Sequence, residues 1–385
     1  MQQEMSSNDT TLEWPSADAI SKLPLDWVIV WSGHENKEKE THHVHERNIA
    51  SKASKKKRIA SKKKRSSSSS QQASDAINNN CAATKNEDVH QPYYLNHVRG
   101  STRIRQASQR VSAALGTVLS TYMLCYLSSS ITLVDLGLTN ITSTHTTVGR
   151  DLVWGFLIGS SIVIIIFIME VLLGWIKIVG FFQTVVKNES FSINFLWDVL
   201  FHIGVSINEE VMLRGWMFTL GCRGILGMAL NRLEKSSSTT TLVTLSIIAS
   251  IILQSSLFSF LHLHSPGSTY VSLLNLFLGG VAASINVMVG GGSLWLGIGW
   301  HFGWNIFMGH ILGRSTSGIP SSCACIDVVP CPKASYKHLH GGTFGPEQGV
   351  LAPLAYVLGI LLVIHIYGYD GMIVWRDRMV STQSF

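Results

Sequence analysis

Charged side chains are scarce in most of this chain. Only 14% of its 385 residues are Asp, Glu, Lys or Arg, 46% are apolar, and the mean hydropathy is +0.24. Soluble globular proteins carry about 25% charged residues. The shortage is confined to residues 111–385, which hold 12 basic and 12 acidic side chains. That composition excludes an ordinary soluble domain for this part and predicts a membrane-embedded one.

Cysteine is also scarce, with six residues in the whole chain. This number is too small for the dense disulfide framework of a small secreted domain. Cys323, Cys325 and Cys331 lie close together in sequence, and three interpretations stay open for them: a metal site, a disulfide in an oxidising compartment, or loop thiols without a further role. Residues 1–24 lack the apolar segment of a signal peptide, so we expect the first internal apolar helix to direct membrane insertion.

The N-terminal tail, residues 1–110, is polar and holds 18 of the 30 Lys and Arg residues. It contains too little apolar surface to offset the entropy cost of ordering, so we predict a disordered tail. A basic run extends from Lys52 to Arg65. Such a run is found in nuclear-localisation and nucleic-acid-binding segments, but ahead of apolar helices it favours contact with anionic membrane lipid. No nucleic-acid partner is expected.

Seven apolar stretches follow, each near the ~20 residues that a helix needs to cross about 30 Å of hydrocarbon. Only helices and closed barrels satisfy their backbone hydrogen bonds in lipid, and strand-like alternation is poor here. We therefore predict an all-α fold, a polytopic transmembrane helical bundle of about seven spans. The stretches are residues 111–134, 152–175, 194–220, 241–263, 270–290, 293–313 and 350–368.

The predicted organisation divides the apolar part into four segments after the tail. They are the first transmembrane helices (111–190), a core that carries the polar motifs (191–315), a loop (316–349), and the last transmembrane helix with a short tail (350–385). The basic tail favours a cytoplasmic, stromal or matrix N-terminus. Basic residues after the third stretch disagree with that orientation, so the topology of this span stays open.

Paired carboxylates occur in the third apolar stretch, in the segment Asn208-Glu-Glu-Val-Met-Leu-Arg-Gly215. Successive helix positions differ by about 100°, so Glu209 and Glu210 are expected to point in different directions. Arg214 lies four residues after Glu210, on the same face, which favours an ion pair. A carboxylate without a cationic partner in low dielectric is a stronger base, which suits Glu209 as a general base. A structural Glu–Arg pair with a solvated Glu209 explains the same spacing.

Two further apolar stretches carry histidines. His262 follows Phe258 by four residues, and His264 lies on nearly the opposite face, so only one of the two is expected to face a shared cavity. His301 and Asn305 share a face and are both hydrogen-bond donors, so together they suit the stabilisation of an oxyanion. Polar clamps between helices, without any catalysis, are the alternative for both stretches.

Gly297, Gly299 and Gly303 accompany the motif at His301 and Asn305. Small residues of this kind let a neighbouring helix approach closely. Other catalytic signatures are missing from the sequence. It has no His-Glu-x-x-His zinc helix, no Gly-x-Ser-x-Gly elbow, no P-loop and no Gly-x-Gly-Asp segment.

Taken together, the three motifs resemble the CPBP family of intramembrane proteases, which includes CAAX prenyl proteases and bacteriocin-processing (Abi) proteins. The resemblance covers about residues 195–313, and the segment Gly341-Gly-x-Phe-Gly-Pro-Glu347 is also similar to the family. The matching motifs, in chain order on three helices, are Glu209-Glu210-x-x-x-Arg214, Phe258-x-x-x-His262 and His301-x-x-x-Asn305.

The resemblance implies a helical bundle whose polar residues line a cavity at membrane level. It implies that Glu209 activates a water with the help of His262, while His301 and Asn305 stabilise the oxyanion. It assigns structural support to Glu210, Arg214 and Phe258. No cofactor is favoured, although zinc is possible, with Glu209, His262 and His301 as the three ligands that a catalytic site usually has.

The sequence therefore predicts an intramembrane endopeptidase that cleaves a membrane-bound or prenylated (CAAX-type) protein. A catalytically silent scaffold of the same fold is the main alternative, and a small-solute transporter that uses the same polar groups is a third. Expected partners are membrane lipid and a membrane-bound or lipidated protein substrate. The location is an integral, multi-pass position in a membrane, with the endoplasmic reticulum and a plastid membrane both compatible.

Overall fold

The computed structural model describes residues 100–128, 131–139, 148–185, 189–232, 239–331 and 337–381. The predicted disordered tail lies outside these residues up to position 99. Residues 100–110, which we assigned to that tail, form the first part of helix α2. This helix carries three Arg residues in its first three turns, so the composition of its N-terminal end resembles that of the tail.

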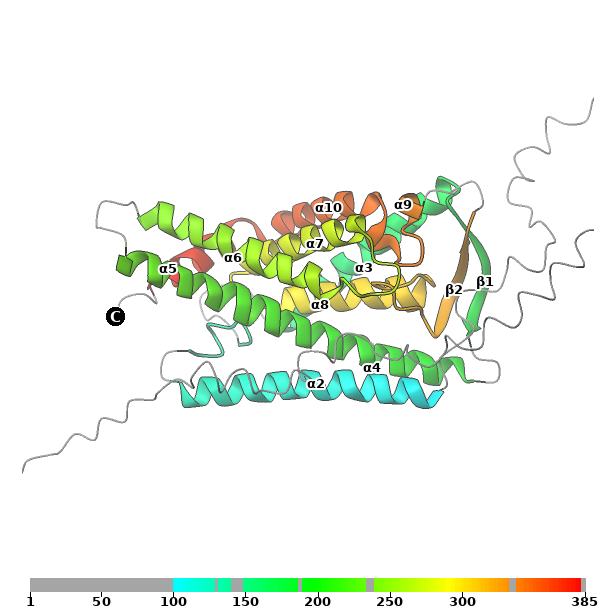
Figure 1. Cartoon of the computed structure of the whole chain (residues 1–385), viewed down its shortest axis with the longest axis horizontal. Helices are drawn as coiled ribbons and strands as arrows, with labels where there is room; N and C mark the ends of the chain where they lie inside the picture. Colours follow the sequence, from blue (N-terminus) through cyan, green and yellow to red (C-terminus); the bar gives the residue numbers. More distant parts are fainter. Residues whose placement is uncertain are drawn as a thin grey trace, which may run out of the picture. The chain divides into compact units, whose positions relative to one another are not determined.

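The described part of the chain is mostly helical (Figure 1). Helix α2 packs along α4, helix α3 packs along α8, and α6 packs against α7. The helices are α2 (Gly100–Leu127), α3 (Val148–Leu172), α4 (Phe191–Glu209), η4 (Glu210–Leu220), α5 (Gly221–Arg232), α6 (Thr239–Leu261), α7 (Tyr270–Val289), α8 (Trp295–Ile306), η5 (Phe307–Ile311), α9 (Lys337–His340), η6 (Pro346–Gln348), α10 (Leu351–Tyr367) and α11 (Asp370–Ser381).

One helical segment runs without a break through α4, η4 and α5. Its middle part, η4, is wound as a π-helix, in which hydrogen bonds connect residues five apart. The paired carboxylates lie at the junction, because Glu209 ends α4 and Glu210 begins η4. Such π turns are rare and frequently occur at functional sites.

The all-α prediction needs one correction, because the structure contains a two-stranded antiparallel sheet. Strand β1 (Ile176–Thr184) pairs with β2 (Cys323–Pro330), with Thr184 opposite Cys323 and a bulge after Ile178. The two strands lie side by side at one end of the helices (Figure 1). Most side chains of β1 are exposed on both faces, so the strand has no apolar–polar alternation that the sequence could reveal. The predicted loop 316–349 contains β2, α9 and η6.

Three helices are long and apolar enough to cross a membrane, namely α3, α6 and α7. A fourth span results if α10 and α11, which are bent by 88° at their junction, are taken together. The structure therefore supports a membrane protein with three or four such helices among the described residues. The other spans of the predicted seven stay a prediction.

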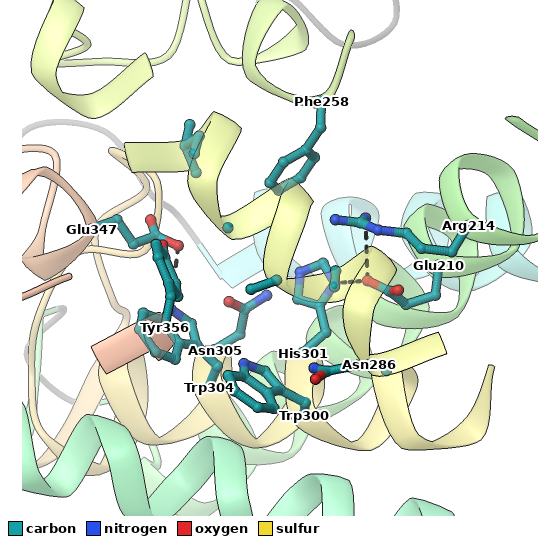
Figure 2. Close-up of a pocket in the computed structure, with 15 residues that line it drawn as sticks. Glu210, Arg214, Phe258, Asn286, Trp300, His301, Trp304, Asn305, Glu347 and Tyr356 are labelled. Atoms are coloured by element: carbon teal, nitrogen blue, oxygen red, sulfur yellow. Dashed lines mark hydrogen bonds and ion pairs between the residues drawn. The ribbon is translucent and has the colours of Figure 1, made fainter. Parts of the chain in front are cut away.

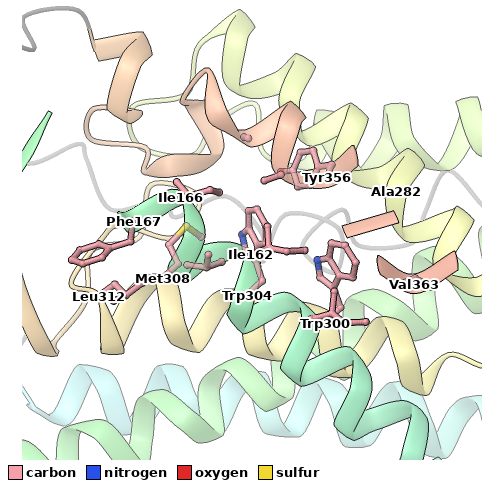
Figure 3. Close-up of a cluster of buried hydrophobic side chains, with 14 of the residues drawn as sticks. Ile162, Ile166, Phe167, Ala282, Trp300, Trp304, Met308, Leu312, Tyr356 and Val363 are labelled. Atoms are coloured by element: carbon pink, nitrogen blue, oxygen red, sulfur yellow. The ribbon is translucent and has the colours of Figure 1, made fainter. Parts of the chain in front are cut away.

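Aromatic and branched side chains from α3, α8 and α10 form the largest core cluster (Figure 3). Trp300 and Trp304 of α8 pack with Ile162 of α3, and the indole of Trp304 stacks on the ring of Tyr356 at 5.3 Å. This cluster lies directly beside the polar face of α8. It therefore fixes the position of the helix that carries His301 and Asn305.

Glycines allow α3 and α8 to pack with their backbones in contact. A Cβ atom on Gly155 or Gly159 of α3 would overlap the backbone oxygen of Leu296 or Trp300, respectively. From the other side, a Cβ on Gly299 would overlap the backbone oxygen of Leu152, and one on Gly303 would meet that of Phe156 at 2.5 Å. The structure thus confirms the close helix approach predicted for Gly299 and Gly303, whereas Gly297 faces the side chain of Glu210.

Replacing Gly159 with Ala is expected to lower the free energy of unfolding by about 1–3 kcal/mol, because the added methyl group would overlap the Trp300 backbone. Gly149 lies on the same helix with open space around it, so Gly149→Ala is the matched control and should change stability by less than about 1 kcal/mol. Thermal unfolding of the purified protein in detergent measures both. Equal responses of the two variants would contradict the close packing at Gly159.

Candidate active site

The predicted ion pair of the first motif is present and buried. Nη1 of Arg214 lies 3.3 Å from Oε1 of Glu210, and both side chains are only 2% exposed. The guanidinium group also lies over the ring of Phe258, 4.8 Å from its centroid. Arg214 therefore connects η4 to α6 and supplies the positive charge that a buried Glu210 requires.

His301 lies between the two carboxylates (Figure 2 shows its contact with Glu210). Its Nδ1 donates to Oε1 of Glu210 at 3.0 Å, and its Nε2 lies 3.8 Å from Oε2 of Glu209. The carboxylates do point in different directions, as the helix geometry predicts. They nevertheless reach opposite nitrogens of the same ring, which the sequence did not reveal. A ring held in this way is oriented, and a positive charge on it is stabilised.

His262 follows the last residue of α6 and is buried, whereas His264 is exposed. Nδ1 of His262 lies 2.9 Å from the backbone oxygen of Phe258, and the two rings meet edge to face at 5.0 Å. Because a carbonyl oxygen only accepts hydrogen bonds, Nδ1 of His262 donates this one. The contacts of Phe258 thus link the second motif to Arg214 and, through Glu210, to His301.

A cavity of about 60 Å³ opens among these helices (Figure 2). That volume is enough for a few water molecules. His301 and Asn305 both line it, one turn apart on α8, together with Glu210 and Arg214. Glu209 and His262 are not part of its wall, so the structure places two of the four predicted catalytic residues in the cavity lining. The remaining lining residues are Phe258, Leu276, Gly279, Ala282, Ala283, Asn286, Gly297, Trp300, Trp304, Glu347 and Tyr356.

Glu347 is a further acidic residue of the cavity wall, facing it from η6. Its Oε2 accepts hydrogen bonds from the backbone N–H and the hydroxyl of Ser317, both at 2.7 Å, and its Oε1 accepts one from Trp304 at 3.3 Å. Burial raises the pKa of this carboxyl group, and the hydrogen bonds from Ser317 and the charge of His262 act in the opposite direction. The sequence placed Glu347 in a family-like segment but gave it no role, because no helical spacing relates it to the other motifs.

The predicted zinc ligands do not form a compact set. Tetrahedral zinc holds nitrogen and oxygen ligands at about 2.0–2.2 Å, so its ligand atoms lie close to one another. Among the residues that the structure describes, Glu209, His262 and His301 do not bring three ligand atoms within 4.8 Å of one another. In addition, Nδ1 of His301 is committed to Glu210. This arrangement does not fit a zinc ion held by these three residues.

Fold and site together define a helical membrane protein with a polar, hydrogen-bonded cluster buried among its apolar helices. Residues 191–307 match the family model for the Rce1-like type II CAAX prenyl endopeptidases. For this segment, the match confirms the resemblance inferred from the three motifs. The family implies a peptidase in a membrane. No curated protein and no solved structure matches the chain.

Replacing Arg214 with Met should lower the free energy of unfolding by about 3–5 kcal/mol, because it leaves Glu210 charged and buried without its counter-ion. The exposed pair of Arg376 and Asp377, at 2.9 Å, offers a matched control. Arg376→Met should change stability by about 0–1 kcal/mol. Unfolding in detergent, followed by tryptophan fluorescence, measures both variants. A small loss for Arg214→Met would show that Glu210 does not depend on this cation.

Proposed function

We propose that this protein is an intramembrane endopeptidase that hydrolyses a peptide bond of a membrane-bound or prenylated, CAAX-type protein. The observation that supports it best is the geometry of His301, whose ring nitrogens each face a carboxylate while the ring lines a water-sized cavity with Asn305. The family match at residues 191–307 supports the same reaction class.

In the proposed reaction, Glu209 is the general base. The carboxylate accepts a proton from a water molecule as the water oxygen attacks the scissile carbonyl carbon. Glu210 is less suited to this task, because Arg214 and the Nδ1–H of His301 already share its Oε1. Glu209 lies 3.8 Å from Nε2 of His301, longer than a direct hydrogen bond, so its carboxylate is less strongly engaged. The proton then passes to the leaving amide nitrogen.

The oxyanion of the tetrahedral intermediate is proposed to accept hydrogen bonds from His301 and Asn305. These side chains lie one helical turn apart on α8 and face the same cavity. Glu210 holds the imidazole through Nδ1 and stabilises its protonated form, which leaves Nε2–H as the donor. His262, with its Nδ1–H bound to the Phe258 carbonyl, is proposed to orient the water through Nε2.

The substrate class follows from the family and from the setting of the site. The cluster is buried between helices of the chain, among them α6 and α7, which are apolar enough to cross a membrane. A substrate that is itself held at the membrane by a prenyl group or a transmembrane segment has access to such a site. The proposed mechanism uses side chains of the protein alone, and the membrane in which it operates stays a prediction.

The test uses the purified full chain in liposomes with a prenylated peptide that ends in a CAAX sequence, and follows release of the C-terminal tripeptide by mass spectrometry. Glu209→Gln is expected to lower turnover by about 10²–10⁴-fold, as the loss of general base catalysis does. His262→Ala, which removes the group that orients the water, should also lower turnover. Asn305→Ala should lower it by about 10²–10³-fold, as the loss of one oxyanion donor does.

The exposed His264 is the matched control for His262, so His264→Ala should retain full turnover. An unprenylated peptide of the same sequence tests whether the lipid defines the substrate. Folded wild-type protein that cleaves neither prenylated nor membrane-spanning peptides would contradict the proposal and favour the catalytically silent scaffold. Glu209→Gln with unchanged turnover would remove this residue from the mechanism.

A further inference from the structure

A second polar cluster is buried where α4, η5 and β2 meet. Asp198 of α4, His310 of η5 and Cys323 of β2 each offer one ligand atom, and these atoms all lie within 4.8 Å of one another. Asp198 is more than 100 positions from the other two residues in the sequence, and all three are at most 6% exposed. Cys323 is one of the thiols that the sequence singled out.

The separations within the cluster match those between ligands of one metal ion. Oδ2 of Asp198 lies 3.2 Å from Nδ1 of His310 and 3.8 Å from Sγ of Cys323. Ligands bound to tetrahedral zinc at about 2.0 Å for nitrogen or oxygen and 2.3 Å for sulfur lie roughly 3.3–3.6 Å apart. The Asp198–His310 separation is slightly shorter than this range, and the Asp198–Cys323 separation is slightly longer.

The other ring nitrogen of His310 also has a hydrogen-bond partner, another imidazole. Its Nε2 lies 3.1 Å from Nε2 of His202, so one of the two rings donates to the other. If His310 donates, its Nδ1 carries the lone pair, and that lone pair faces Oδ2 of Asp198 and the backbone oxygen of Cys323, 3.2 Å away. In that arrangement three electron-rich atoms lie near one another, which favours a cation between them. Oδ2 of Asp198 also accepts a hydrogen bond from the hydroxyl of Ser322.

His202 gives a second, independent indication of an unusual environment. It lies one turn after Asp198 on α4 and is 4% exposed. Whichever ring donates, Nδ1 of His202 is a buried polar atom without a hydrogen-bond partner among the described residues. Buried polar side chains are nearly always hydrogen-bonded. Hydrogen bonds within this cluster nevertheless leave Nδ1 of His202 without a partner among the described residues.

We propose that Asp198, His310 and Cys323 bind a divalent transition-metal ion of the zinc class, with His202 accepting a hydrogen bond from the Nε2–H of His310. A thiolate, an imidazole and a carboxylate form a ligand set that zinc binds and that magnesium and calcium, which prefer oxygen ligands, do not. The ion would fasten β2 to α4 and to the end of the helix that carries His301 and Asn305.

The test measures metal in the full chain, purified in detergent with a tag that contains no histidine. After incubation with zinc and removal of the unbound ion, mass spectrometry is expected to find one zinc per chain. Chelator should lower the melting temperature, and added zinc should restore it. Wild-type protein that retains no zinc and shows no such shift would overturn the proposal, leaving a purely hydrogen-bonded cluster.

Variants locate the ion. Cys323→Ser and His310→Ala should lose it, whereas Cys325→Ser, on the same strand and half-buried, and His301→Ala should keep it. With cobalt in place of zinc, wild type and Cys325→Ser should show the thiolate-to-metal absorption band, and Cys323→Ser should not. If His301→Ala loses the metal and His310→Ala keeps it, the ion is bound at the candidate active site, and the proposal is overturned. The wild-type measurement decides the matter even if a variant fails to fold.

Discussion

The buried carboxylate of Glu210 is the group on which the arrangement of the candidate site depends. A charge at this depth requires compensation, and it receives a cation from Arg214 and a hydrogen bond from His301. Those contacts join η4 to α8, and the contact of Arg214 with Phe258 adds α6. The three helices that carry the sequence motifs are thus connected through one carboxylate, which sets the orientation of the imidazole beside it.

Helix α8 can lie close to Glu210 because the face that packs against α3 is formed by glycines. Gly299 and Gly303 allow α3 to approach, and Gly297 leaves room for Oε2 of Glu210, which lies 3.0 Å from where a Cβ would be. Large side chains on the third side, chiefly Trp300 and Trp304, pack into the core. Helix α8 therefore has three different faces. Glycines face α3, the polar pair His301 and Asn305 faces the cavity, and the tryptophans face the core.

Local spacing explains what could be predicted and what could not. The Glu210–Arg214 pair and the shared face of His301 and Asn305 are relations within one helix, and the structure has both. The spacing of Gly299 and Gly303 also lies within one helix and indicated that a neighbour would pack closely, though not which one. The approach of both carboxylates to one imidazole is a relation between helices, so no spacing reports it. Strand β1 was missed because its exposed residues do not alternate in character. Glu347 lines the cavity from the short helix η6, and no repeating sequence pattern predicts the position of so short an element.

Two polar clusters, one at His301 and one at His310, lie along the same helical segment, since His310 follows Asn305 by five residues, in η5. The His301 group contacts η4, and the His310 group contacts α4 and β2, so each fixes a different part of the segment. The charge of His301 also acts on His202, which places the two groups within electrostatic range. A cation bound at His310 would therefore do more than anchor the end of the helix. It would also disfavour positive charge at His301, so the carboxylates of Glu209 and Glu210 are the groups that keep the proposed oxyanion donor protonated.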